Sequence, residues 1–297
     1  MGKEFNKRCY GITIIRSENS NWNADFSGTP RMLPDDNGTI YATDKALKYA
    51  MRKYWNDTGK DVFVWKTFKE NQSVNILEER YKNMKSKLNA KDHFDLLSKC
   101  IDVKLFGITL AVEKITLSLT GPAQISYGVD KFNINRVYSN SILSPFANSS
   151  SKDESKASTL GNEIKNLKSY YVYDFVVNPR NSTDHYDDVA KLMKLNEDDI
   201  ESFKDALNKG ATNLNTASKI GSENVLTLFI TLKEGTKTQI RALKNLITIK
   251  GDDTIIFKEI NELLSKYPEI ESIELFKSDP KCKVENIENW IITDVIK

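Results

Sequence analysis

Apolar residues run together or alternate with polar ones in short segments that predict strands. The clearest segments are CYGITIIR (9–16), VFVWKTF (62–68), KLFGITLAVEKITLSL (104–119), YYVYDFVVNP (170–179) and VLTLFITL (225–232). Alternation over about four to eight residues fits a half-buried strand, and a run rich in β-branched and aromatic residues fits a buried one. The chain therefore predicts a sheet whose strands are far apart in sequence.

A helical period is clearest in TDKALKYAMRKYW (43–55), where Thr43 is suited to the N-cap and Asp44 to the first turn. Its predicted apolar face contains Ala46, Leu47, Ala50, Met51, Tyr54 and Trp55. Lys45, Lys48 and Arg52 recur at i, i+3 and i+7, so they predict a separate cationic stripe. That stripe is either a solvated face or a contact surface for an anion.

Further helices are predicted at 75–102, with a break near Asn89, at 184–209, and in IIFKEINELLSKYPEI, which the strand SIELFKS follows. The order strand, helix, strand, then helix and strand again favours an α+β fold, a ferredoxin-like (RRM-like) βαββαβ core with insertions. We find no internal repeat and no RNP1 pattern, and residues 1–297 are interpreted as one domain.

Three segments interrupt this pattern. Residues 17–42 form a long polar loop, and loops longer than about 12–15 residues are often functional. Residues 139–168 are rich in serine and predict an arm or a mobile loop outside the core. The Gly121-Pro122 pair in SLTGPAQISYG (118–128) predicts a turn between two strands.

Composition narrows the class of protein. Hydrophobic residues make up 39% and charged residues 28%, as in a soluble globular chain, and no apolar run approaches the roughly 20 residues of a membrane helix. No signal peptide is recognised. Cys9, Cys100 and Cys282 are far apart, which indicates buried or incidental thiols in a reducing cytoplasm. With only His93 and His185 as histidines, no metal site or cofactor is expected.

The net charge of +2 is unevenly distributed. Residues 250–297 contain seven basic and eleven acidic residues, so the first 249 residues carry a net charge of +6. A basic bias of this size permits a nucleic-acid groove.

Four motifs, in this order, resemble the crRNA-binding backbone subunit of type I CRISPR surveillance (Cascade) complexes, the Cas7 family. They are the loop SENSNWNADFSGTPR (17–31), the helix TDKALKYAMRKYW, the segment LTGPAQISYG with its Gly-Pro-x-Gln pattern, and KGATNLNTASKIGSENVL (209–226). The likeness spans roughly residues 10–230, and subtype I-B fits best. The loop after the first strand departs from the Pro- and Gly-containing loop of many relatives, and the acidic C-terminal region matches no part of the pattern.

The resemblance implies a fold and a role. The fold is a palm (about 9–68, 104–138 and 170–232) with fingers (69–103), a thumb (139–168) and a C-terminal helix–strand region (233–297). Copies of the subunit oligomerise along one crRNA as a helical filament, and each thumb covers the RNA on its neighbour. The bases remain free to pair with target DNA, which a recruited helicase-nuclease cuts. Other complex subunits are further partners, no membrane is involved, and the subunit itself is not an enzyme.

A guide-displaying protein should hold phosphates and leave base edges free, because phosphate contacts position RNA without reading its sequence. The RNA-binding residues expected on this basis are Asn21, Arg31, Lys45, Lys48, Arg52, Gly121, Gln124, Asn213, Asn215 and Lys219. Gly121 would let backbone amides and Gln124 approach the guide; the alternative is a plain hairpin turn. Leu143 and Phe146 are expected to wedge between bases or to anchor the thumb. Trp22 either stacks on a base or packs on its own domain.

Two other functions remain open. One is a metal-dependent target-RNA endonuclease, as in the backbone subunits of type III complexes, which the resemblance would place at Asp25 in the loop after the first strand. Asp25 would otherwise order its loop. The other is a free-standing RNA-binding protein.

Overall fold

The computed structural model describes residues 2–112, 115–132, 136–143, 160–184, 193–240 and 242–295. Its helices are α1 (Asp44–Asp57), α2 (Leu77–Lys87), α3 (His93–Ser98), α4 (Ile101–Phe106), α6 (Glu197–Lys209) and α7 (Lys258–Leu264). Its strands are β1 (Cys9–Ser20), β2 (Tyr41–Ala42), β3 (Gly107–Val112), β4 (Ile115–Thr120), β5 (Ala123–Ile125), β6 (Gly128–Asp130), β7 (Val137–Leu143), β8 (Leu160–Val177), β9 (Ser222–Leu232), β10 (Thr248–Ile249), β11 (Thr254–Ile256), β12 (Ile270–Lys277), β13 (Lys283–Glu285) and β14 (Ile291–Asp294). The fold is a mixture of helices and sheets, as the sequence predicts.

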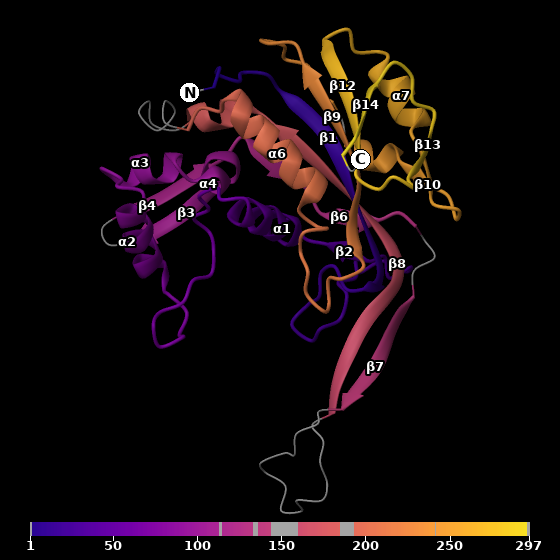
Figure 1. Cartoon of the computed structure of the whole chain (residues 1–297). Helices are drawn as coiled ribbons and strands as arrows, with labels where there is room; N and C mark the ends of the chain where they lie inside the picture. The colour runs from indigo at the N-terminus through magenta and orange to yellow at the C-terminus, as the bar shows by residue number, and fades with distance from the viewer. Residues whose placement is uncertain are drawn as a thin grey trace, which may run out of the picture.

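A nine-stranded sheet runs through the centre of the molecule (Figure 1), in the order β14-β12-β9-β1-β8-β6-β2, with β5 and β7 also paired to β8. Tyr10 of the central strand β1 faces Ile230 of β9 on one side and Val176 of β8 on the other, both antiparallel. The strands predicted at 9–16, 170–179 and 225–232 are confirmed, and they are the three central strands.

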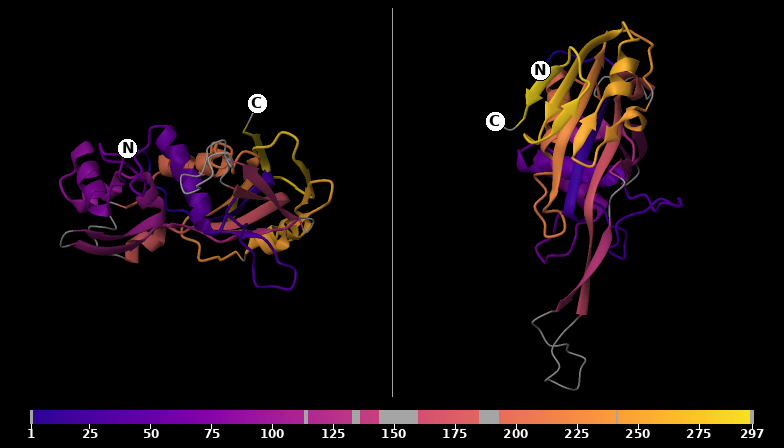
Figure 2. Two further views of the ribbon diagram at one scale, coloured as in Figure 1. Left: turned by 90° about the horizontal axis from the view of Figure 1, so that it is seen from below. Right: turned by 90° about the vertical axis from the view of Figure 1, so that its right-hand side faces the viewer.

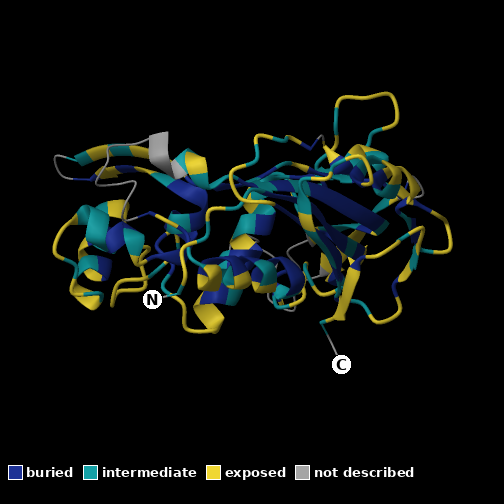
Figure 3. Ribbon diagram, turned by 90° about the horizontal axis from the view of Figure 1, so that it is seen from above, coloured by how far each residue is buried: buried dark blue, intermediate teal, exposed yellow. Residues whose placement is uncertain are grey.

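Each face of this sheet is covered by a different part of the chain. On one face, Ile15 packs with Leu47 of α1 and Phe203 of α6. On the other, Ile12 packs with Phe257 and its neighbours from residues 240–290. The acidic C-terminal region therefore covers the second face, and the central strands are buried between the layers (Figure 3). The bases of a nucleic acid cannot stack on an open sheet face, as they do in common RNA-recognition domains.

A third hydrophobic cluster forms a small lobe beside α1 (Figure 1). It joins Tyr81 and Met84 of α2, Leu96 of α3 and Leu119 of β4. Among the described strands, β3 and β4 pair only with each other. The break predicted near Asn89 is confirmed, since α2 ends before it and its φ is +46°. β3 and β4 therefore belong to this lobe and not to the central sheet.

The strand predicted at 62–68 is wrong. Backbone groups of Val62, Phe63 and Val64 bond to side chains, and Phe68 forms an isolated β-bridge to Val74. The Phe63 and Val64 N–H groups donate to the two carboxylate oxygens of Asp102, at 2.8 and 3.0 Å, and Arg80 donates to the carbonyls of Val62 and Phe63. A segment whose amides are satisfied in this way has no need of a ladder.

The strand structure predicted at 104–119 is confirmed for β3 and β4, but not for residues 104–106, which are the end of the helix α4. The segment forms two antiparallel strands, with Gly107 opposite Thr120. Apolar and polar residues alternate in both β3 and β4, so the hydrophobic pattern alone did not reveal that the chain reverses direction between them.

A two-stranded ribbon leaves the sheet where β7 pairs with the first half of β8, from Val137↔Asn166 to Leu143↔Leu160. Figures 1 and 2 show it projecting well beyond the body of the molecule. The predicted arm at 139–168 is thus a β-ribbon over its described residues; residues 144–159 lie outside the description. An isolated two-stranded ribbon is at best marginally stable in water, which makes it a candidate for contacts with a partner.

Candidate nucleic-acid interface

Three segments meet where β1 ends and the ribbon begins, and we call residues 17–22, 164–169 and 218–222 the junction. The side-chain amide of Asn21 donates to the carbonyls of Gly28 (2.9 Å) and Ile164 (3.1 Å), and its backbone N–H donates to Ser218 (2.9 Å). Asn21 is therefore a buried tie between the loop after β1, the ribbon and the loop before β9.

Small polar side chains fill the interior of the junction. The hydroxyls of Ser17 and Ser20 lie 2.7 Å apart, Ser20 reaches Ser222 at 3.0 Å, and Asn166 donates to Ser169 at 3.0 Å. All five side chains are buried. Buried polar groups are normally hydrogen-bonded, and a satisfied network fixes a unique arrangement. The polar motifs at 17–22 and 218–222 thus set how the ribbon leaves the sheet.

Lys219 clamps this arrangement. Its Nζ donates to the carbonyls of Asn21 (2.6 Å) and Trp22 (2.8 Å), and no carboxylate of the described residues pairs with it. Burial without a counter-ion lowers the Lys219 pKa to about 8. The side chain acts on the protein's own backbone, in line with a structural role.

Trp22 is fully buried, and its Nε1 donates to the hydroxyl of Tyr173 at 2.6 Å. The interpretation in which Trp22 packs on its own domain is confirmed. Arg31, in the same loop, is half-buried, and its backbone carbonyl accepts from Tyr41.

Asp25 orders the tip of this loop. Its Oδ1 accepts from the Ser27 N–H (2.9 Å), the Ser27 hydroxyl (2.7 Å) and the Thr29 N–H (3.0 Å), which is an Asx turn. The Ser27 hydroxyl is the main cause of its lowered pKa. Nowhere in the described chain do three His, Cys, Asp or Glu side chains gather as metal ligands. The turn leaves Phe26 fully exposed.

The three cations predicted as one stripe on α1 have different surroundings. Lys45 is 85% exposed, and its closest carboxylate is Asp44 at 3.7 Å. The Lys48 and Arg52 side chains are only 13% and 14% exposed. Lys48 pairs with Asp44 at 3.1 Å, Arg52 pairs with the buried Asp102 at 2.9 Å, and both lie over the ring of Phe106. Only Lys45 projects freely into solvent.

The Gly121-Pro122 pair separates β4 from β5, as predicted. These strands belong to different sheets, so the plain hairpin turn is wrong, and Gly121 has a packing reason. A Cβ at Gly121 would lie 2.3 Å from the Gly107 nitrogen and 2.4 Å from the Leu105 carbonyl oxygen, so two backbones cross here at close range. Gln124 donates to the Gly121 carbonyl at 2.8 Å. The glycine therefore permits contact within the protein, where the small lobe joins the sheet.

Two of the remaining predicted residues lie together. Asn213 and Asn215 both line a shallow concavity of about 360 Å³ with Tyr54 and Lys209. Asn213 also donates to the Asp57 carboxylate at 2.7 Å, and Asn215 is exposed. Leu143 ends β7 on the ribbon, and Phe146 lies outside the described residues.

Sequence reasoning passed over one surface group. Tyr49 lies on α1 outside the predicted apolar face, and its ring stacks on Trp65 with centroids 5.4 Å apart and planes inclined by 16°. An aromatic residue outside the apolar stripe of a helix was the available signal.

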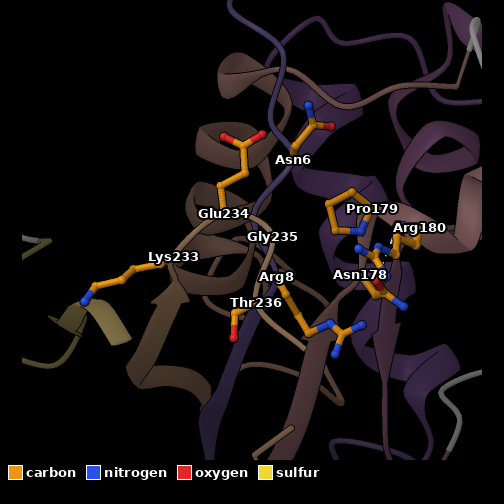
Figure 4. Close-up of a pocket in the computed structure, with 9 residues that line it drawn as sticks. All are labelled: Asn6, Arg8, Asn178, Pro179, Arg180, Lys233, Glu234, Gly235 and Thr236. Atoms are coloured by element: carbon orange, nitrogen blue, oxygen red, sulfur yellow. Dashed lines mark hydrogen bonds between the residues drawn. The ribbon is translucent and has the colours of Figure 1, made fainter. Parts of the chain in front are cut away.

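A separate concavity of about 220 Å³ lies at the opposite end of the sheet (Figure 4), lined by Asn6, Arg8, Asn178, Pro179, Arg180, Lys233, Glu234, Gly235 and Thr236. Arg8 donates to the carbonyl of Thr238 at 3.3 Å, and the Lys233 amine extends away to the carbonyl of Pro268 at 2.8 Å. The length of β1, roughly 40 Å, separates this concavity from the junction.

Among the described helices, none has the length and hydropathy of a membrane span.

A family model described as CRISPR-associated protein Cas7 matches residues 7–271, from before β1 to the first residues of β12. One similar solved structure is described as "CRISPR RNA-guided surveillance complex, pre-nicking", with 12% identity and a TM-score of 0.47 over 95% of this chain and 96% of that chain. Another, "CRISPR RNA-guided surveillance complex", has 13% identity and a TM-score of 0.42 over 93% and 95%. No curated protein matches the chain.

Proposed function

The chain belongs to the Cas7 family of CRISPR-associated proteins, and we propose that it is a non-catalytic backbone subunit of a type I surveillance complex, of subtype I-B, that binds crRNA. The family match over residues 7–271 carries this proposal. In this role, copies of the chain line up along one guide in the cytoplasm and display its bases to target DNA. Other complex subunits and a recruited helicase-nuclease are the further partners.

The central strands support a ferredoxin-like palm. β1, α1, β6, β8, α6 and β9 follow one another in βαββαβ order, and the four strands lie in the sheet as β9-β1-β8-β6, each antiparallel to its neighbour. The lobe of α2, α3, β3 and β4 corresponds to the fingers, which on this basis extend beyond 69–103 to residue 120. The β7–β8 ribbon corresponds to the thumb.

Guide phosphates, in this proposal, follow the junction side of the molecule and the outer face of α1. Lys45, Arg31 and Asn215 offer their side chains there, because each is at least partly exposed. The other expected residues do not contact the guide in this proposal; they position the segments that do. Asn21 and Lys219 hold the loops that face the guide, while Lys48, Arg52, Gly121, Gln124 and Asn213 fix α1 and the adjoining segments. Leu143 and Phe146 are proposed wedge residues of the thumb.

The endonuclease function gains no support from the geometry. Asp25 already accepts three hydrogen bonds through one oxygen, and among the described residues no group of three possible metal ligands gathers at it. A loop-ordering role accounts for every contact of this side chain.

The proposal is tested by purifying the tagged chain from its native host and sequencing the RNA that comes with it. Guides that share one repeat-derived handle are expected. RNA without a common handle, or a chain that purifies free of RNA, would contradict the proposal.

The thumb has a test of its own. Replacing residues 144–162 by a short Gly/Ser linker should leave the monomer folded but lower the number of copies loaded on one guide, as counted by native mass spectrometry. An unchanged copy number and an unchanged periodic nuclease footprint would show that the ribbon is not the thumb.

A further inference from the structure

The stacked pair Tyr49–Trp65 presents an aromatic surface that the fold does not bury. Trp65 packs its inner side against the first hydrophobic cluster, and Tyr49 lies over it while remaining 50% exposed. The core-facing residues of α1 are Leu47, Ala50, Met51 and Trp55. The helix is therefore anchored without Tyr49.

Cations flank this pair. Lys45 lies one helical turn before Tyr49 on the same face of α1, exposed and only loosely paired. Lys66, next to Trp65 in the chain, is exposed and lies 5.1 Å from the centroid of the exposed Phe68 ring. Lys53, one turn after Tyr49, already pairs with Asp57. Aromatic rings beside exposed lysines are typical of surfaces that bind single-stranded nucleic acid.

We propose that Tyr49 and Trp65 form a stacking platform for one unpaired nucleobase, with Lys45 holding the adjacent phosphate. The outer face of the Tyr49 ring is the contact, so the base extends the existing two-ring stack to three. The inference rests on the proposed RNA-binding role, because the platform would add a base contact to the surface proposed to bind the guide phosphates. The base comes either from the guide RNA or from a DNA strand that the complex leaves unpaired.

Stacking of this kind has properties that separate it from phosphate binding. Every base has a π-face, so the contact tolerates any sequence. Stacking neutralises no phosphate, so it adds no counterion release to the salt dependence. Lysine–phosphate contacts instead release counterions and weaken as salt rises. Loss of the Tyr49 ring should therefore lower affinity by about tenfold without changing the slope of affinity against salt.

Trp65 supplies the measurement. The chain has four tryptophans, and Trp22, Trp55 and Trp290 are buried, so Trp65 is the one whose ring lies in the stack that the base would extend. Fluorescence of the intact protein is followed during titration with single-stranded RNA, single-stranded DNA, duplex RNA and inorganic polyphosphate. Trp65→Phe identifies the part of the signal that belongs to Trp65.

The variants are Tyr49→Leu, which removes the ring but keeps apolar cover for Trp65, and Tyr49→Phe, which keeps the ring. Tyr127→Leu is a matched control, because Tyr127 is also 50% exposed and its ring centroid also lies 5.4 Å from that of another aromatic, Tyr41. Circular dichroism checks that each variant is folded.

Quenching by single strands but not by polyphosphate, with affinity lost in Tyr49→Leu and kept in Tyr49→Phe and Tyr127→Leu, supports the platform. Quenching by RNA alone assigns the base to the guide, and quenching by DNA as well assigns it to either strand. Equal RNA affinity in wild type and Tyr49→Leu, or quenching by duplex only, would overturn the platform while leaving the proposed function intact. Failure of the proposed function appears separately, as native purification without repeat-derived RNA.

Discussion

The two sides of α1 contain similar residues and use them differently. On the inner flank, Lys48 pairs with Asp44 and Arg52 pairs with Asp102, and both cations lie against Phe106. Their charges are therefore neutralised by carboxylates of the protein itself. On the outer face, Lys45 remains exposed. A basic stripe in a helical sequence thus divides into cations that hold the helix in place and a cation that is free to hold a ligand.

The junction resembles the inner flank. Its serines and asparagines look like a hydrogen-bonding surface in the sequence, yet they bond to one another and to the backbone. Lys219 does the same with two carbonyls. Polar residues near a binding surface therefore support its shape when buried, and only the exposed ones are available to a partner.

The largest effect that sharpens this comparison is expected for Asp102→Ala on the inner flank. The fully buried carboxylate accepts from Arg52 and from two backbone N–H groups, and its loss leaves all three unpaired. Breaking a buried pair in this way costs about 3–5 kcal/mol. The free energy of unfolding in urea is the measurement. Glu78→Ala, which removes the exposed Glu78–Lys82 pair, is the control and should cost at most about 1 kcal/mol. Equal losses in the two variants would show that Arg52 is not held as described.

The junction should respond to pH through Lys219. Its folded-state pKa, about 8, lies below the ordinary value of 10.5, so the unfolded chain binds more protons between these values. Stability conferred by Lys219 should therefore rise as pH increases from 8 to 10.5, by at most about 3 kcal/mol relative to Lys219→Met. Unfolding of both proteins is measured at each pH. A difference in stability that stays constant over this range would contradict the burial of the amine.

The central strands and α1 were predictable because their hydrophobic patterns are long and their caps regular. Thr43 caps α1 by accepting from the Ala46 N–H at 3.3 Å, and β1, β8 and β9 have the apolar content of buried strands. The conformation of residues 62–68 was not predictable, because the backbone of residues 62–64 bonds to Asp102 and Arg80, which are distant in sequence.

The candidate site was predicted as a set of residue types, without their exposure. Lys45 and Arg52 have the same helical period, but only the tertiary contact with Asp102 separates their roles. Gly121 was recognised as a turn residue, whereas the crossing with Gly107 that requires it depends on how the small lobe meets the sheet. Tyr49 was overlooked because its partner Trp65 belongs to the segment whose structure was mispredicted.

On the outer face of α1, Lys45→Ala should weaken RNA binding without weakening the fold. Removal of one phosphate contact lowers the slope of log affinity against log salt by about 0.7 for a single strand. Filter binding over a range of salt concentrations gives the slope, and Lys258→Ala, an exposed lysine on α7, is the control. A Lys45/Lys48/Arg52 triple alanine would not test the predicted cationic stripe cleanly. Loss of Arg52 leaves the buried Asp102 carboxylate without its counter-ion, so the fold would be weakened together with RNA binding. An unchanged slope in Lys45→Ala would remove the outer face of α1 from the RNA surface.

The smallest effect is expected for Asp25→Ala, where an exposed carboxylate has its hydrogen bonds within its own turn. The Ser27 hydroxyl and the Ser27 and Thr29 amides stabilise the charged form, which lowers the Asp25 pKa. Its contribution to stability is thus present above the ordinary carboxyl pKa and is lost as pH falls through the lowered folded value, well below neutrality. At neutral pH, Asp25→Ala should loosen the turn that exposes Phe26. In the proposed complex, cleavage of target DNA by the recruited helicase-nuclease should be unchanged. Asp36→Ala, in the same loop, is the control.

Metal-dependent cutting of complementary RNA that Asp25→Ala abolishes and Asp36→Ala retains would instead make Asp25 a catalytic ligand. The polar groups of this loop would then belong with the outward-facing residues of α1.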